Sequence, residues 1–319
     1  MNDITVFSGQ AHKAFAQEMC QLLRVPLSPS RTTRFSNDCL QVQLRDNCRR
    51  RDVYIVQPLV PPVQENLTEL LLMLDAARGA SAAHVNAVIP HYAYARSDKK
   101  DAPRISIGGR LVADLLATAG ATRVVTMNLH CQQVHGFFSI PVDHLSAIRV
   151  LAGHFANDDL SNTVVVSPDF GNAKAAGEFA RCLGVPMAAG SKRRLADDRV
   201  VIDAIVGDVA GKNVIVIDDE IATAGSIIEL IEALNRVGVA TIRVACTHGL
   251  FTGRAVERLS GRSDIAEIVT TNTVPAPVDR EFPELTQLSV APIFAEAVQR
   301  ITRGESVSSL FSDVSTYGP

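Results

Sequence analysis

"VIVIDDEIATAGSIIELI" (214–231) starts with β-branched apolar residues, crosses a short polar segment and ends in apolar residues at helical spacing. The first part indicates a buried strand, and the residues from Ser226 onward indicate an amphipathic helix. Asp218 and Asp219 stand together where the strand is expected to end. Adjacent carboxylates repel each other and are costly to bury. We therefore expect hydrogen-bond donors or a metal ion beside them.

The same alternation of short apolar strands and helices runs through most of the chain. The expected strands are 52–59, 84–90, 123–129, 163–169, 213–219 and 241–248, and the expected helices are 66–80, 109–120, 172–184 and 226–238. Apolar strands that are each followed by a helix are typical of parallel sheets covered on both faces. The alternation is longer than one sheet needs, and its halves look alike. It predicts two α/β domains that meet near residues 145–150.

Ligands of such sheets bind beyond the carboxyl ends of the strands. Polar clusters follow four of the expected strands: Arg96–Lys100, Asn128–His135, Ser167–Lys174 and Asp218–Ser226. In the last cluster, Thr223-Ala224-Gly225-Ser226 opens a helix, and the unpaired N–H groups of a helix N-terminus attract anions. A phosphorylated sugar would offer a phosphate to this turn and hydroxyls to the aspartates. The alternative is an ordinary strand-to-helix turn with Ser226 as its N-cap.

Composition argues against several classes of protein. The chain has 319 residues, a net charge of −3, 5% aromatic residues and no Trp, which disfavours nucleic acid as a partner. No apolar stretch reaches the roughly 20 residues that span a bilayer, and the start has no secretion signal. The six cysteines are scattered without a CxxC pair, which disfavours a zinc cluster and fits a reducing cytoplasm.

The 214–231 stretch resembles the phosphoribosyl pyrophosphate (PRPP) loop of type I phosphoribosyltransferases and of PRPP synthetases. Other stretches favour the PRPP synthetase family, because they match it in order along nearly the whole chain. These are FSGQAHKAFAQEM (7–19), IPHYAYARSDKK (89–100), NLHCQQVHGFFSIPVDHL (128–145), VVVSPDFGNAKAAGEFARCLGVPMA (164–188), KRR (192–194) and RGESVSSLF (303–311). A plain phosphoribosyltransferase would leave the first half of the chain unexplained.

The resemblance implies a ribose-phosphate diphosphokinase, which transfers the β,γ-diphosphoryl group of ATP, with Mg²⁺, to the C1 hydroxyl of ribose 5-phosphate. It implies two type I phosphoribosyltransferase-like domains, 1–147 on the ATP and metal side and 148–319 on the ribose 5-phosphate side, each a mainly parallel sheet flanked by helices. The last ~30 residues are expected to form a helix and a short tail, and packing of these residues back on the first domain is left open.

The resemblance also implies roles for individual residues, all present in this sequence. Those expected to bind ribose 5-phosphate are Asp218, Asp219, Ala222, Thr223, Ala224, Gly225 and Ser226. Those expected to bind ATP are Phe35, Asn37, Cys39, Arg96, Ser97 and Asp98, with the first three reaching the adenine of a neighbouring subunit. His130 and Asp169 would be linked to the metal ion, and Lys192 and Arg194 would be catalytic cations on a flexible basic loop.

The sequence departs from the family pattern in several places. Ala222 stands where the loop usually has a third Asp, and Asn128 and Gln132 replace acidic residues around His130. Asn37 and Cys39 alter the segment that reads adenine, Ser97 replaces a usual Gln, and DAPRISIGG (101–109) is one residue short. Altered nucleotide preference or regulation is expected from these changes. The alternative is a non-catalytic, PRPP synthetase-associated regulatory subunit.

The expected partners are therefore ATP and ribose 5-phosphate, with no nucleic acid and no membrane. We expect a cytoplasmic homo-oligomer built from dimers, with a hexamer left open.

Overall fold

The computed structural model describes residues 4–196, 199–277 and 282–310. By its contacts the chain divides into two units. Unit 1 comprises the described residues of Met1–Ser146, Thr273–Pro275 and Val290–Pro319, and unit 2 comprises those of Ala147–Asn272 and Ala276–Ser289. The domain limits expected at 1–147 and 148–319 stay a prediction.

Unit 1 is built on a five-stranded sheet in which all neighbouring strands are parallel. Its order is β1 (Ile4–Ser8), β4 (Asp52–Val56), β5 (His84–Ile89), β6 (Arg123–Met127) and β7 (Val142–Leu145). The strands are rich in Val and Ile, whose branched side chains suit a pleated, buried surface. Because all the strands are parallel, their carboxyl ends share one edge of the sheet.

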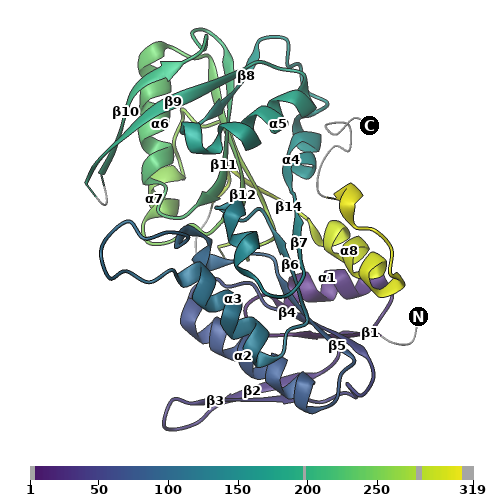
Figure 1. Cartoon of the computed structure of the whole chain (residues 1–319). Coiled ribbons are helices and arrows are strands. Elements are labelled where there is room, and N and C mark those ends of the chain that lie inside the picture. Colours follow the sequence, from purple (N-terminus) through teal and green to yellow (C-terminus); the bar gives the residue numbers. More distant parts are fainter. Residues whose placement is uncertain (1–3, 197–198, 278–281, 311–319) are drawn as a thin grey trace. The chain divides into compact units, whose positions relative to one another are not determined.

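Helices cover both faces of the unit 1 sheet (Figure 1). The helices α2 (Val63–Gly79) and α3 (Gly108–Ala119) pack with Phe7, Val53 and Ile55 in one core cluster. On the other face lie α1 (Lys13–Leu23) and the C-terminal helix α8 (Ala291–Arg303), whose Phe15 and Phe294 rings meet edge to face, 5.4 Å apart. The Tyr54 hydroxyl of β4 lies 2.9 Å from the Thr302 hydroxyl of α8. The C-terminal helix is thus part of unit 1.

Smaller elements also belong to unit 1. The strands β2 (Ser30–Arg34) and β3 (Leu40–Leu44) form an antiparallel hairpin, and the 3₁₀ turns η1 (Ala93–Arg96) and η2 (Gln132–Phe137) follow β5 and β6. A further short turn, η4 (Ser308–Leu310), follows α8. The hairpin was not expected, because the polar sequence SRTTR has no apolar run to indicate a strand.

Unit 2 is built on a seven-stranded sheet. Its order is β10 (Arg199–Val206), β9 (Met187–Ala196), β8 (Thr163–Ser167), β11 (Asn213–Ile221), β12 (Thr241–Gly249), β13 (Glu267–Thr271) and β14 (Leu285–Leu288). Every neighbouring pair is parallel except β9 and β10. β11 contains the first part of the 214–231 stretch with which the sequence analysis began. It lies between two parallel neighbours.

The faces of the unit 2 sheet are also covered by helices. α6 (Gly225–Val237) and α7 (Ala255–Leu259) contribute buried Leu and Ile side chains to one core cluster with the strands. α4 (Ile148–Phe155) and α5 (Ala173–Leu183) pack on each other, and the rings of Phe155 and Phe179 are 6.1 Å apart. α5 follows a short turn, η3 (Phe170–Asn172). α6 ends at Gly238, whose left-handed φ of 80° closes the helix without a Cβ clash.

The expected α/β class is confirmed, and every strand and helix expected from the sequence is present. One run has a more regular backbone than its sequence indicates. Lys192–Arg194 was expected on a flexible basic loop, and its backbone lies in β9 and pairs with β10, with Lys192 opposite Ile202. The small residues before Lys192 and the three consecutive cations conceal this strand in the sequence, and its pairing with β10 shows that it is extended.

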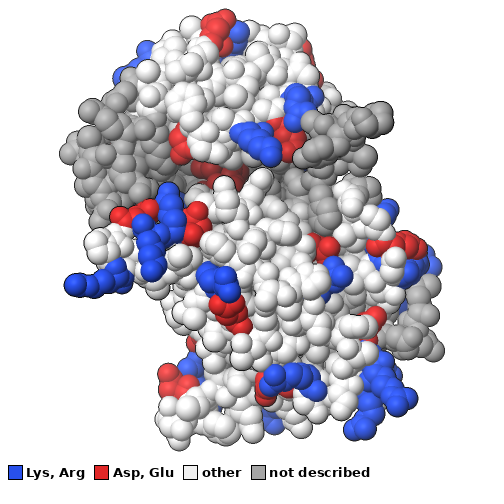
Figure 2. All heavy atoms as spheres, in the orientation of Figure 1, with Lys and Arg blue, Asp and Glu red and all other residues white. Residues whose placement is uncertain are grey.

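The surface shown in Figure 2 carries basic and acidic side chains interspersed, in keeping with the net charge of −3. Several of them pair along helices, such as Arg110 with Asp114, 2.9 Å apart. In the part of the chain that the structure describes, no helix is long and apolar enough to cross a membrane.

Replacing Phe294 by Ala should lower the free energy of unfolding by about 3–5 kcal/mol. Phe294 and Phe15 are fully buried between α8 and α1, so the substitution removes a ring and leaves a cavity. Urea unfolding followed by circular dichroism measures the change. Leu22→Ala on α1 is the control, because Leu22 is 43% exposed and should change stability little. Equal effects of the two substitutions would contradict the packing of α8 on α1.

Candidate active site

The two adjacent aspartates lie inside β11 rather than at its end. Asp218 is opposite Cys246 of β12, and the pairing continues through Glu220 and Ile221, which are opposite His248 and Gly249. The strand is therefore two residues longer than the sequence indicates. The apolar-to-polar change at Asp218 marks the end of the buried run and not the end of the strand.

Asp218 is a strongly perturbed carboxyl group. Its pKa is raised well above the ordinary value, first because burial removes it from water and second because the charge of Asp219 repels its own. The charge of Asp169 acts in the same direction. The Asp219 N–H donates a hydrogen bond to Asp218 Oδ1 over 2.9 Å, which offsets part of this cost. Unit 2 thus collects three carboxylates that a cation or hydroxyl donors would stabilise.

Asp169 is positioned by the turn after β8. Its side chain accepts a hydrogen bond from the Asn172 N–H (3.2 Å), and its carbonyl accepts one from the Ser167 hydroxyl (2.7 Å). The Asn172 amide donates to the Ile217 carbonyl of β11 over 3.0 Å, which ties the turn to the neighbouring strand. The structure therefore brings Asp169 to the edge of the sheet where Asp218 and Asp219 lie.

The turn between β11 and α6 has an unusual backbone. Ala224 is buried and takes a left-handed conformation with a φ of 63°, and it is the N-cap of α6. The methyl side chain of Ala224 cannot cap the helix. Among the described residues, no side chain accepts a capping hydrogen bond at the N-terminus of α6. The alternative with Ser226 as N-cap is therefore wrong, because Ser226 lies in the first turn of the helix. The first N–H groups of α6 are left to attract an anion.

Neighbouring residues hold this turn in place. The Thr252 N–H donates to the Ala222 carbonyl (2.9 Å), and the Leu250 N–H donates to the Ile221 carbonyl (3.0 Å). From α7, the Arg258 guanidinium donates from Nη1 to the Thr223 carbonyl over 2.9 Å. A Cβ added to Gly225 would meet no atom closer than 3.8 Å, so the backbone there is open to close approach.

In unit 1, His130 is an exposed residue just beyond the end of β6. The preceding Asn128 has a left-handed φ of 39°, and its N–H donates to the Leu145 carbonyl over 3.0 Å. The Leu129 N–H donates to Nε2 of His144 over 2.8 Å. Burial, with a smaller contribution from His135, lowers the pKa of His144 to about 4. A neutral His144 can accept this hydrogen bond, so β7 fixes the backbone that carries His130.

Arg96 and Ser97 lie at the end of η1, next to the start of α3. The Ser97 hydroxyl accepts a hydrogen bond from the Gly108 N–H (2.9 Å), and its carbonyl accepts one from the Gly109 N–H (2.9 Å). A Cβ on Gly109 would come within 3.0 Å of the Tyr94 carbonyl, so the close approach of α3 to this carbonyl needs glycine at position 109. Ser97 thus closes the exposed loop that contains Asp98. Its expected role with ATP stays a prediction.

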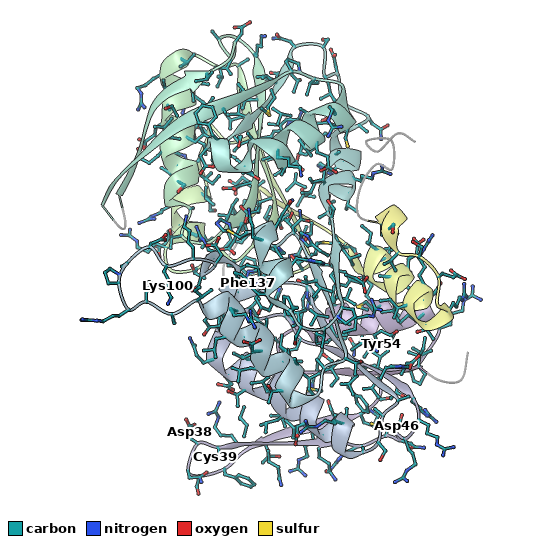
Figure 3. The ribbon with its side chains drawn as sticks, in the orientation of Figure 1. Asp38, Cys39, Asp46, Tyr54, Lys100 and Phe137 are labelled. Atoms are coloured by element: carbon teal, nitrogen blue, oxygen red, sulfur yellow. The ribbon has the colours of Figure 1, made fainter. Side chains whose placement is uncertain are left out.

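The expected adenine segment forms the turn of the β2–β3 hairpin. The Phe35 N–H donates to the Cys39 carbonyl (2.9 Å), and the Cys39 N–H donates to Asn37 Oδ1 (3.2 Å). Phe35 is 47% exposed, and Cys39 is exposed as well. Figure 3 shows Cys39 at the end of the hairpin and Lys100, in the loop after Arg96, well apart from it. Unit 1 of one chain therefore does not bring its expected ATP residues together.

The remaining expected residues are not brought into one site by what the structure describes. The backbones of Lys192 and Arg194 lie in β9, but their side chains fall outside the described residues. His130 belongs to unit 1 and Asp169 to unit 2, so a metal site shared by them stays a prediction. Among the described residues, no group of three or more His, Cys, Asp or Glu side chains could hold a metal ion.

Two residues that the structure connects to the site were not singled out from the sequence. The sequence could have indicated His144 as a residue of the site, because it lies in the family-like stretch 128–145. It stands two residues after the start of the strand β7. Nothing in the sequence indicates a role for Arg258, because an arginine in AVERL resembles any exposed charged residue of a helix. Its hydrogen bond to Thr223 becomes evident only from the structure, in which the chain after β12 returns to the turn before α6.

Comparisons with known proteins cover nearly the whole chain. A sequence model for the N-terminal domain of ribose phosphate pyrophosphokinase matches residues 4–120, and one for the phosphoribosyl synthetase-associated domain matches residues 195–312. A relative from Streptomyces coelicolor is 63% identical over 311 residues, 98% of each chain. A ribose-phosphate pyrophosphokinase of Deinococcus radiodurans is 50% identical over 314 residues, which are 97% of this chain and 98% of the relative.

A solved structure is similar over the same length. The crystal structure of phosphoribosylpyrophosphate synthetase from Mycobacterium smegmatis superposes with a TM-score of 0.88 at 36% identity. The match covers 95% of this chain and 100% of that chain.

Replacing His144 by Gln should make the protein less sensitive to acid. The pKa of His144 is about 4 in the folded chain against an ordinary 6.5, so between these values the unfolded chain binds more protons. The stability that depends on neutral His144 is therefore present above pH 6.5 and is lost as the pH falls toward 4. At pH 5 the loss is about 2 kcal/mol.

Urea unfolding of both proteins at pH 7.5 and at pH 5 measures this effect. Gln keeps an oxygen that can accept from the Leu129 N–H, so the variant should fold and should lose less stability than the wild type at pH 5. An equal loss in the two proteins would contradict the burial of a neutral His144.

Proposed function

The chain belongs to the ribose-phosphate pyrophosphokinase family, and we propose that its described site binds ribose 5-phosphate for the family's reaction. That reaction forms PRPP and AMP from ATP and ribose 5-phosphate. The observation that carries the assignment to this site is the arrangement at the carboxyl end of β11. Asp218 and Asp219 lie inside the strand, near this end, and the left-handed turn at Ala224 follows, where the helix N-terminus has no side-chain cap among the described residues.

Asp218 and Asp219 are proposed to accept hydrogen bonds from the ribose hydroxyls. Hydroxyl donors would offset both causes of the raised pKa of Asp218, which are its removal from water and the repulsion by Asp219. Residues 222–226 are proposed to hold the 5-phosphate through the N–H groups at the start of α6 and the hydroxyls of Thr223 and Ser226. Gly225 leaves the backbone open to the phosphate. The aspartates and the 222–226 turn thus match the two ends of one phosphorylated sugar.

The described residues form no group of three or more metal ligands, but the carboxylates at this edge of unit 2 suit an ion that substrate phosphates also hold. Carboxylate oxygens are the ligands that Mg²⁺ prefers, and Mg²⁺ is usually held by one or two carboxylates together with substrate phosphates rather than by a dedicated cage. The mutual repulsion of Asp169, Asp218 and Asp219 would be reduced by a cation. We propose that Asp169 and His130 hold the ion, which when bound neutralises charge on the triphosphate of ATP.

The chemical step is a displacement at the β-phosphorus of ATP. The C1 hydroxyl oxygen of ribose 5-phosphate forms a bond to this phosphorus, the bond from phosphorus to the α,β-bridging oxygen breaks, and AMP leaves with that oxygen. The hydroxyl proton is released to solvent. Charge spreads over the transferred oxygens, and cations at short range stabilise it. Lys192 and Arg194 of β9 are proposed to supply them.

ATP is proposed to bind between two copies of the chain. Arg96, Ser97 and Asp98 lie near the start of α3, whereas Phe35, Asn37 and Cys39 lie on the exposed turn of the hairpin, well apart from that loop (Figure 3). An exposed aromatic ring on a protruding turn is suited to stack on an adenine held by a second copy. This arrangement makes a homo-oligomer necessary for activity. A cytoplasmic location is proposed with it, supported by the scattered cysteines.

Incubation with ATP, ribose 5-phosphate and Mg²⁺ should release AMP and form PRPP, and the Lys192→Ala variant should be slower by about 100-fold or more. Coupled detection of AMP measures the rate, and binding of ribose 5-phosphate by calorimetry checks that the variant is intact. A wild-type rate no higher than that of Lys192→Ala would instead favour the non-catalytic associated subunit.

Two inactive variants should complement each other if the nucleotide site is shared by two copies. Phe35→Ala lacks the proposed adenine contact, and Lys192→Ala lacks the proposed catalytic cation, so a mixed oligomer contains some sites with both wild-type residues. Co-refolding the two variants should restore part of the AMP release. Mixing two preparations of the same variant is the control. Absence of any recovery in oligomers shown to be mixed would place both residues in sites formed by a single chain.

A further inference from the structure

We propose that Arg258 of α7 is a phosphate-binding residue of this site, where it holds the 222–226 turn and presents its charge to the 5-phosphate of ribose 5-phosphate. The proposal rests on the function proposed above and adds a residue to it. Arg258 comes from a different element, which returns to the turn after β12.

Two distances place the guanidinium of Arg258 against the turn. Its Nη1 donates to the carbonyl of Thr223 over 2.9 Å. The same atom would lie 3.9 Å from a Cβ added to Gly225. Thr223 and Gly225 flank Ala224, the left-handed N-cap of α6. The cation therefore lies beside the backbone whose N–H groups are proposed to receive the phosphate.

The charges around the turn show why a cation is needed there. Residues 222–226 carry no charge of their own, and Asp218 and Asp219 lie just before them on β11. A phosphate bound at this turn approaches two carboxylates, and the helix N-terminus offers only about half a unit of positive charge. A full positive charge at Thr223 and Gly225 makes the turn selective for an anion despite those carboxylates.

The chemistry of arginine suits this double task. A guanidinium has five N–H donors in a planar fork, and it binds phosphate oxygens with two parallel hydrogen bonds. One donor of Arg258 is used on the Thr223 carbonyl. Within the described ranges 4–196, 199–277 and 282–310, no carboxylate forms an ion pair with Arg258, and its side chain is exposed. The remaining donors can therefore reach a ligand.

The same helix region offers a matched comparison. Arg254, one turn earlier, is also exposed, but its Nε donates to Glu257 Oε2 over 2.8 Å, and within the described part of the chain it forms no hydrogen bond with the turn. Ala255, Val256 and Leu259 are buried and keep α7 in place, so a change at either arginine leaves the packing of the helix intact. Arg254 and Arg258 thus differ in their contact with the turn and not in their exposure.

The test is calorimetric binding of ribose 5-phosphate and of ribose to the wild type, Arg258→Gln and Arg254→Gln, each as the full chain. Gln retains an amide N–H₂ that can donate to the Thr223 carbonyl, but it lacks the charge. Arg258→Gln should weaken ribose 5-phosphate binding by about tenfold or more, leave ribose binding unchanged and raise KM for ribose 5-phosphate with little change in kcat. Arg254→Gln should match the wild type.

The outcomes separate this proposal from the function on which it rests. If Arg258→Gln binds ribose 5-phosphate as tightly as the wild type does, the proposal is overturned. It is also overturned if ribose and ribose 5-phosphate lose affinity by the same factor, because Arg258 then only shapes the turn. If the wild type binds no ribose 5-phosphate, the proposed site itself fails. Equal unfolding midpoints for the three proteins show that the comparison is between folded chains.

Discussion

The burial of Asp218 beside Asp219 is the constraint on which the rest of unit 2 depends. Asp218 lies opposite Cys246 of β12, and both aspartates are half-buried, whereas β8 pairs with β11 only as far as Val216. Burial and like charge raise the pKa of Asp218. The Asp219 N–H turns back to the Asp218 carboxylate to offset part of this cost. A fold that keeps such a pair needs a ligand or a cation to complete it.

Both units place a residue with a left-handed φ soon after an inner strand. Asn128 directly follows β6 and Ala224 lies in the turn after β11, with φ angles of 39° and 63°, and each costs about 1–3 kcal/mol that its surroundings must offset. The surroundings do so in both cases. Asn128 donates to the Leu145 carbonyl and the next N–H to His144, while the carbonyls before Ala224 accept from Thr252 and Arg258. The strain turns the chain sharply, so that functional groups lie at the sheet edge.

Several departures from the family pattern have local uses in this chain. Ser97 accepts a hydrogen bond from Gly108 and closes the loop before α3. Asn37 accepts one from the Cys39 N–H and shapes the hairpin turn. Ala222 offers its carbonyl to Thr252, a contact that any residue could make, so the structure explains the turn but not the loss of an acidic side chain there. The backbone of the site is kept while individual side chains differ.

The sequence by itself determined the α/β class, several strands and helices of each half, among them β4, β6, β8 and β11, and the residues that flank the carboxyl ends of those strands. It could do so because apolar runs, helical spacing and adjacent polar groups are local patterns. Tertiary structure decided the rest. β9 is a strand because β10 pairs with it, Ala224 and not Ser226 caps α6, and His144 and Arg258 reach the site from other elements. These features depend on contacts between residues far apart in the chain, and no local pattern encodes such contacts.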